Sequence, residues 1–160
     1  MAKSSDKIRE IKEIGSYAYN LSLKSLEYRT SIYLEHSNYL NKKDDFYIYL
    51  MKQNLHRIIE NRTTLYGLKK QLISYRYDED NAIQNEAIEQ LNLVNTAIDS
   101  CWESIKSVEE TFGKEFKEEN ITPLFRQVGN NSSFSKDKNK SIALIVYIII
   151  LSIGALLFFF

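Results

Sequence analysis

The chain has 160 residues with 21 basic and 21 acidic side chains, so its formal net charge is zero, and it lacks the basic surplus typical of nucleic-acid-binding proteins. Five glycines and one proline are too few for a turn-rich or sheet-rich fold, and the single cysteine can form neither an internal disulfide nor, alone, a zinc site. The composition therefore predicts an all-α domain.

The first expected helix covers residues 5–39. Apolar and small residues recur along it at intervals of three and four, which places them on one helical face. They are Ile11, Ile14, Ala18, Leu21, Ser25, Tyr28 and Ile32. The stretch 37–45 is rich in Asn and charged residues, so it predicts a turn in which Asp44 or Asp45 caps the next helix.

The second expected helix covers residues 45–75. Its stripe consists of Ile48, Met51, Leu55, Ile58, Arg62, Leu65, Lys69 and Leu72. Arg62 and Lys69 interrupt the apolar pattern, and we expect their stems to lie along the seam while their charged heads stay in water. A parallel row of Ile59, Tyr66 and Ile73 widens the apolar face, as is typical of a helix that touches two neighbours.

The third expected helix covers residues 82–119 and has the clearest stripe. The stripe consists of Ile83, Ala87, Leu91, Val94, Ile98, Cys101, Ile105, Val108, Phe112 and Phe116. We expect this helix to end near Asn120, ahead of Pro123, because the residue before a proline avoids the helical conformation. Three long helices with short connections predict an elongated antiparallel three-helix bundle with coiled-coil-like packing over residues 1–119.

Residues 120–140 are expected to form a flexible juxtamembrane linker, since Gly, Asn, Ser and Lys bury little apolar surface. Three lysines in this stretch, Lys136, Lys138 and Lys140, could attract anionic lipid headgroups.

The last twenty residues, 141–160, contain no charged side chain. A helix of this length spans roughly 30 Å, the thickness of a bilayer's hydrocarbon core, so the segment predicts a single transmembrane helix. The expected membrane-anchoring residues are Ile142, Leu144, Ile145, Tyr147, Ile148, Leu151, Leu156 and Phe158. Lysines precede this segment, and the start of the chain shows no signal peptide, so we expect a single-pass, tail-anchored protein with its N-terminal domain in the cytoplasm.

The sequence shows no catalytic motif, and we expect neither enzymatic activity nor a cofactor or metal. His56 and Glu60 lie four residues apart and predict a surface contact, and Cys101 on the apolar stripe predicts a buried structural thiol. For a protein-binding surface the candidates are Trp102, because tryptophan is enriched at binding hot spots, and the row that contains Ile59 and Tyr66.

The leading hypothesis is a non-enzymatic helical adaptor or scaffold that recruits a protein partner, or associates with itself, at the cytoplasmic face of a membrane. The alternative is a membrane-perturbing effector, similar to a holin, a toxin or a defence protein, that oligomerises through its tail. A third hypothesis is a SNARE-like tether, because the order of helical region, striped helix and terminal anchor resembles that of SNARE proteins. In this chain Cys101 stands at the centre of the stripe, where that family has Gln or Arg, and Pro123 interrupts the run towards the membrane.

Overall fold

The computed structural model describes residues 4–131, with side chains up to Phe125, and every element in this range is helical. The elements are α1 (Ser4–Lys42), α2 (Asp45–Tyr75), α3 (Asn81–Phe112), the short 3-10 turn η1 (Lys114–Phe116) and α4 (Glu118–Asn131). Residues 4–125 form one compact unit, and the described residues 126–131 lie outside it. All side-chain contacts described below lie within this unit. The all-helical class is thus confirmed for the described part of the chain.

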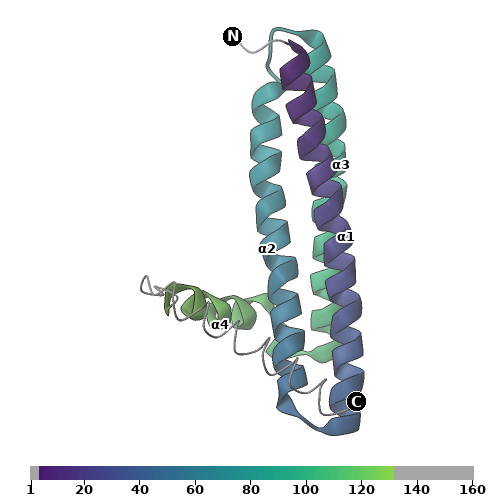
Figure 1. Ribbon diagram of the computed structural model, residues 1–160, viewed down its shortest axis with the longest axis vertical. Coiled ribbons are helices and arrows are strands. Elements are labelled where there is room, and N and C mark those ends of the chain that lie inside the picture. Colours follow the sequence, from purple (N-terminus) through teal and green to yellow (C-terminus); the bar gives the residue numbers. More distant parts are fainter. Residues whose placement is uncertain (1–3, 132–160) are drawn as a thin grey trace, which may run out of the picture. The chain divides into compact units, whose positions relative to one another are not determined.

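The three long helices α1, α2 and α3 pack side by side, and α2 runs antiparallel to the other two (Figure 1). All three predicted stripes point into the core. Fully buried members from the three helices include Ile11, Ile32, Met51, Leu55, Ile58, Leu65, Leu72, Ile83, Val94, Ile105 and Val108. Burying one such side chain contributes about 1.5–3 kcal/mol, so this seam is the main source of the bundle's stability.

The turn between α1 and α2 follows the predicted capping chemistry. The Asp44 carboxylate accepts a hydrogen bond of 2.9 Å from the backbone N–H of Phe46, which confirms Asp44 as the cap of α2. The end of α1 is closed by Lys43, which adopts a left-handed φ of 54° and donates its N–H to the Tyr39 carbonyl at 2.7 Å.

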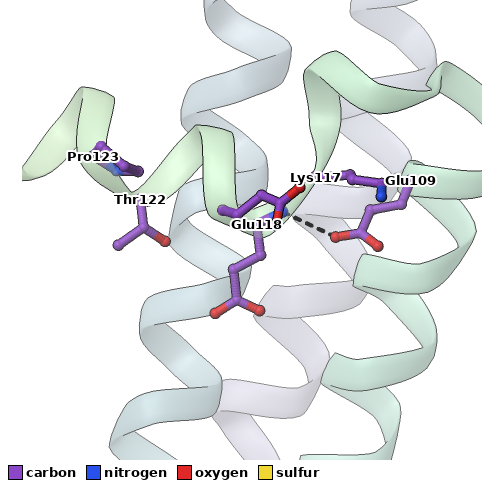
Figure 2. A pocket seen from close by; sticks show the side chains of 6 residues that line it. Glu109, Lys117, Glu118, Thr122 and Pro123 are labelled. Atoms are coloured by element: carbon purple, nitrogen blue, oxygen red, sulfur yellow. Dashed lines mark hydrogen bonds between the residues drawn. The ribbon is translucent and has the colours of Figure 1, made fainter.

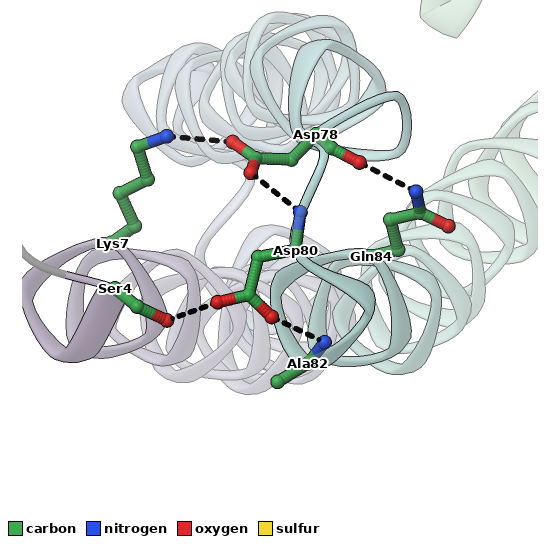
Figure 3. Close-up of polar contacts among 6 residues, drawn as sticks. All are labelled: Ser4, Lys7, Asp78, Asp80, Ala82 and Gln84. Carbon is green, nitrogen blue, oxygen red and sulfur yellow. Dashed lines mark hydrogen bonds and ion pairs between the residues drawn. The ribbon is translucent and has the colours of Figure 1, made fainter.

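At the other end of the bundle, the first turn of α1 is tied to the loop between α2 and α3 (Figure 3). Lys7 Nζ lies 2.6 Å from the Asp78 carboxylate, and the Ser4 hydroxyl donates to Asp80 at 2.6 Å. These two contacts are the main reasons why the pKa of Asp78 and that of Asp80 lie below their usual values. Asp80 also caps α3 through the Ala82 N–H at 2.8 Å, so one short loop fixes the register of all three helices.

The third helix ends earlier than the sequence predicted. α3 stops at Phe112 instead of reaching 119, because Gly113 adopts a φ of 80° and a ψ of −160°. This conformation is open to glycine and strained for other residues. The chain then turns through η1, and this turn folds Phe116 back onto the core, where it is buried as its place in the stripe predicted.

Residues 118–131 form α4 where the sequence predicted a linker from residue 120, and Pro123 lies inside this helix. A proline in a helix interior costs about 3 kcal/mol. Ile121 is fully buried, which contributes about 1.5–3 kcal/mol, and Phe125 adds to this by packing, partly buried, against the core. Packing on the bundle therefore offsets the local cost of the proline.

Within residues 4–131, no helix combines the length and the apolar character needed to cross a bilayer. The predicted transmembrane segment 141–160 lies outside the described residues. The same holds for its anchoring side chains and for the lysines that precede it.

Candidate functional site

Trp102 of α3 and Tyr66 of α2 meet on one side of the bundle. The indole Nε1–H of Trp102 donates a hydrogen bond of 3.1 Å to the Tyr66 hydroxyl. Both side chains remain about half-exposed, at 45% for Trp102 and 46% for Tyr66. Two of the three predicted contact residues are thus neighbours on the surface, held in place by each other.

Arg62 lies beneath this pair and fixes the tryptophan ring. Its guanidinium carbon stands 3.9 Å from the centroid of the Trp102 ring, a cation–π contact, and its Nη2 lies 2.5 Å from a carboxylate oxygen of Glu118. The sequence predicted that the head of Arg62 would stay in water, but the residue is only 7% exposed. The Arg62 guanidinium contacts Glu118 and Trp102 instead of water, and the periodicity of α2 predicts neither contact.

Ile59, the third predicted contact residue, is 4% exposed and belongs to the core. The row of Ile59, Tyr66 and Ile73 drifts across the helix surface, so its first member is covered by the bundle while the other two are half-exposed. A partner could reach Ile59 only if the bundle opened.

The surface around Trp102 and Tyr66 continues along α2 and α3, towards the loop that joins them. A groove there is lined by Lys69, Ile73, Arg76, Ile88, Leu91, Asn92 and Asn95. Ile73 and Ile88 are each about two-fifths exposed on its rims. We use the name α2/α3 face for the surface formed by Tyr66, Lys69, Lys70, Ile73, Ile88, Asn95, Asp99 and Trp102. The apolar stripe of α3 does not include Ile88, and the one signal for it is an isoleucine one position beyond the stripe residue Ala87.

In the opposite direction, past Arg62, the same side of the bundle is covered by the chain itself. Phe125 stacks on the His56 ring with centroids 4.8 Å apart and planes 13° apart, and Lys52 lies over the Phe116 ring at 5.7 Å. At this junction a pocket is lined by Glu109, Lys117, Glu118, Glu119, Thr122 and Pro123 (Figure 2). The Glu109 carboxylate accepts a 2.9 Å hydrogen bond from the backbone N–H of Glu118, which ties the start of α4 to α3.

The predicted contact between His56 and Glu60 is present, with 3.4 Å between His56 Nε2 and a Glu60 carboxylate oxygen. The imidazole is largely covered by Phe125 rather than open to solvent, and its Nδ1 has no hydrogen-bond partner among the described residues. Its surroundings are aromatic, so this histidine contributes to the docking of α4.

Cys101 is fully buried, as the sequence predicted. Its thiol donates to the Ser25 hydroxyl at 3.3 Å, and Asn61 Nδ2 donates to the same oxygen at 3.0 Å. Burial raises the pKa of the Cys101 thiol above its usual value, although the Ser25 contact opposes this effect. The three residues come from α3, α1 and α2 and form a polar layer that specifies how the helices align.

Within the described residues, no group of three or more His, Cys, Asp or Glu side chains could hold a metal ion. The α2/α3 face offers aromatic, aliphatic and charged groups suited to a protein contact. Comparison with protein-family models, with curated proteins and with solved structures gave no match for this chain.

Proposed function

We propose that the protein is a non-enzymatic, single-pass, tail-anchored helical adaptor or scaffold. Residues 141–160 would hold it in a membrane, and the helical bundle would present its α2/α3 face on the cytoplasmic side. Anchoring raises the effective concentration of whatever binds this face, so a modest contact becomes effective at the membrane.

The observation that carries this proposal is the Trp102 side chain, which is half-exposed yet held by contacts to Arg62 and Tyr66. A large aromatic residue that is already ordered loses little conformational freedom when a partner covers it, so more of its burial energy contributes to binding. The uncharged segment 141–160 supports the membrane part of the proposal.

The membrane part is tested by extracting vesicles that carry the full chain with alkaline carbonate. An anchored protein stays with the lipid after extraction, and a variant in which Ile145, Ile148 and Leu151 are replaced by Asp is released. Release of the unaltered protein would overturn the anchor.

The alternative, a membrane-perturbing effector, makes a different prediction for the same vesicles. A tail that oligomerises and breaches the bilayer releases an entrapped dye at low protein-to-lipid ratios, whereas an adaptor leaves the vesicles sealed. Dye release that requires residues 141–160 would favour the effector over the adaptor.

A further inference from the structure

We propose that the α2/α3 face binds a second copy of this chain, side by side and in parallel. In this pair the two-fold axis runs along the helices, and α2 of each copy lies against α3 of the other. The inference rests on the proposed function, because a shared membrane holds two copies upright in the same orientation.

On the face itself, the two helices contribute charges of opposite sign. Among the residues that define it, α2 contributes Lys69 and Lys70, whereas α3 contributes Asp99. A rotation about an axis parallel to the helices places α2 of each copy opposite α3 of the other. An axis perpendicular to the helices would instead place α2 against α2 and α3 against α3. Like charges would then face and repel each other.

One pair of opposite charges on this face stands at matching heights along the bundle. Lys70 lies one turn C-terminal to Tyr66, and Asp99 lies one turn N-terminal to Trp102. Because α2 and α3 are antiparallel and Tyr66 contacts Trp102, both steps lead in the same direction along the bundle, by about 6 and 4.5 Å. A parallel second copy keeps these heights, so Lys70 of each copy meets Asp99 of the other.

Lys70 and Asp99 are free to pair with a second copy. Both side chains are exposed, and neither has an ion-pair partner among residues 4–125. The α1/α3 side differs, because a charge pair already bridges it: Lys12 of α1 lies 3.5 Å from Glu86 of α3. The α2/α3 face therefore has the unmatched charges that a second copy would satisfy.

The face also exposes four aliphatic or aromatic side chains. Tyr66, Ile73, Ile88 and Trp102 are each about half-exposed along this face. On the other side of Arg62 the same surface is already covered by Phe116 and by residues 118–125. A second copy would extend the cover over the remaining apolar stretch.

The size of the face indicates why the membrane matters. A stable dimer in solution usually buries about 800 Å² on each partner. Four half-exposed apolar side chains with their charged rims provide less than that, so the pair should be weak in dilute solution and populated when the copies share a bilayer.

The test uses two variants of the full chain in vesicles, Lys70→Glu and Asp99→Lys, labelled at their N-termini with a donor or an acceptor dye. Each variant alone places two like-charged pairs in the interface, and we expect roughly tenfold weaker energy transfer between its copies than for the unaltered chain. A mixture of the two variants restores both opposite-charge pairs, so transfer between different variants should return to the level of the unaltered chain.

Lys24→Glu, on an exposed part of α1, is the matched control and should leave energy transfer unchanged. Flotation of the same vesicles reports separately whether the chains are anchored. If all variants float but the mixture transfers no more energy than either variant alone, the proposed pairing is overturned while the anchor stands. If the unaltered chain does not float, the anchor fails, and the same mixture at high protein concentration in detergent solution then decides the pairing.

Discussion

Replacing Glu118 by Ala should destabilise the bundle far more than a surface substitution, because it leaves Arg62 as a buried cation without its anion. Breaking a buried ion pair costs about 3–5 kcal/mol. The Glu118 side chain is 33% exposed, so water reaches the guanidinium once the carboxylate is gone. We therefore expect a loss of about 2–3 kcal/mol in the free energy of unfolding, below the range for fully buried pairs.

The neighbouring substitution Glu119→Ala is the matched control, since it removes the same charge from the same first turn of α4 without touching Arg62. It should cost at most about 1 kcal/mol, the size of a helix-dipole effect. Arg62→Met should be milder than Glu118→Ala, because it removes the buried charge itself. It should also shift the fluorescence of the chain's one tryptophan.

Urea unfolding of the full chain in detergent micelles, followed by circular dichroism, measures these differences. Equal losses for Glu118→Ala and Glu119→Ala would refute the reasoning, and so would a loss for Arg62→Met as large as that for Glu118→Ala.

Three further predictions follow from the fold. Gly113→Ala should lower the free energy of unfolding by about 1–3 kcal/mol, because alanine is strained at this φ and ψ; an unchanged urea midpoint would contradict the C-cap geometry. The Cys101 thiol should resist alkylating reagents at neutral pH and react at once in urea, because it is buried and its pKa is raised; mass spectrometry distinguishes this outcome from rapid labelling of the folded chain. The pKa of Asp78 is lowered in the folded state, chiefly by Lys7. The Asp78 carboxylate therefore stabilises the fold above its unfolded pKa of about 4, and this stabilisation is lost as the pH falls through the folded-state pKa. Asp78→Asn should therefore reduce the loss of stability in acid, and an unchanged pH profile between about pH 5 and 2 would count against the Lys7 contact.

Much of the bundle could be predicted because each helix carries its own periodic stripe. The stripe of α3 predicted eight of the eleven buried positions from Ile83 to Val108, and the other three are Gln90, Ala97 and Ser104. The stripe does not indicate where α3 ends, because Phe116 continues its spacing beyond the helix. Gly113 ends the helix through its backbone conformation and leaves the apolar pattern uninterrupted. α4 was missed for a related reason: its stability depends on Ile121 packing against the bundle, which overrides the local effect of Pro123.

The candidate surface was harder to predict than the core. Trp102 and Tyr66 could each be proposed from residue type. Their contact depends on the register between α2 and α3, which cannot be derived from the pattern of either helix alone. Ile59 and Tyr66 lie on one row of α2 and are both predicted as contact residues, yet Ile59 is buried and Tyr66 is half-exposed. The burial of Arg62 depends on Glu118, 56 residues away in sequence.

If the α2/α3 face brings two anchored copies together, as we propose, shortening its exposed apolar side chains should separate them. Ile73→Ala with Ile88→Ala removes exposed apolar groups from this face, and Leu23→Ala with Leu34→Ala removes two apolar side chains of α1 that are at least as exposed. Energy transfer between labelled full chains in vesicles of equal protein density is the measurement. We expect a several-fold fall in energy transfer for the first double variant and none for the second; equal transfer in both would overturn the proposed pairing.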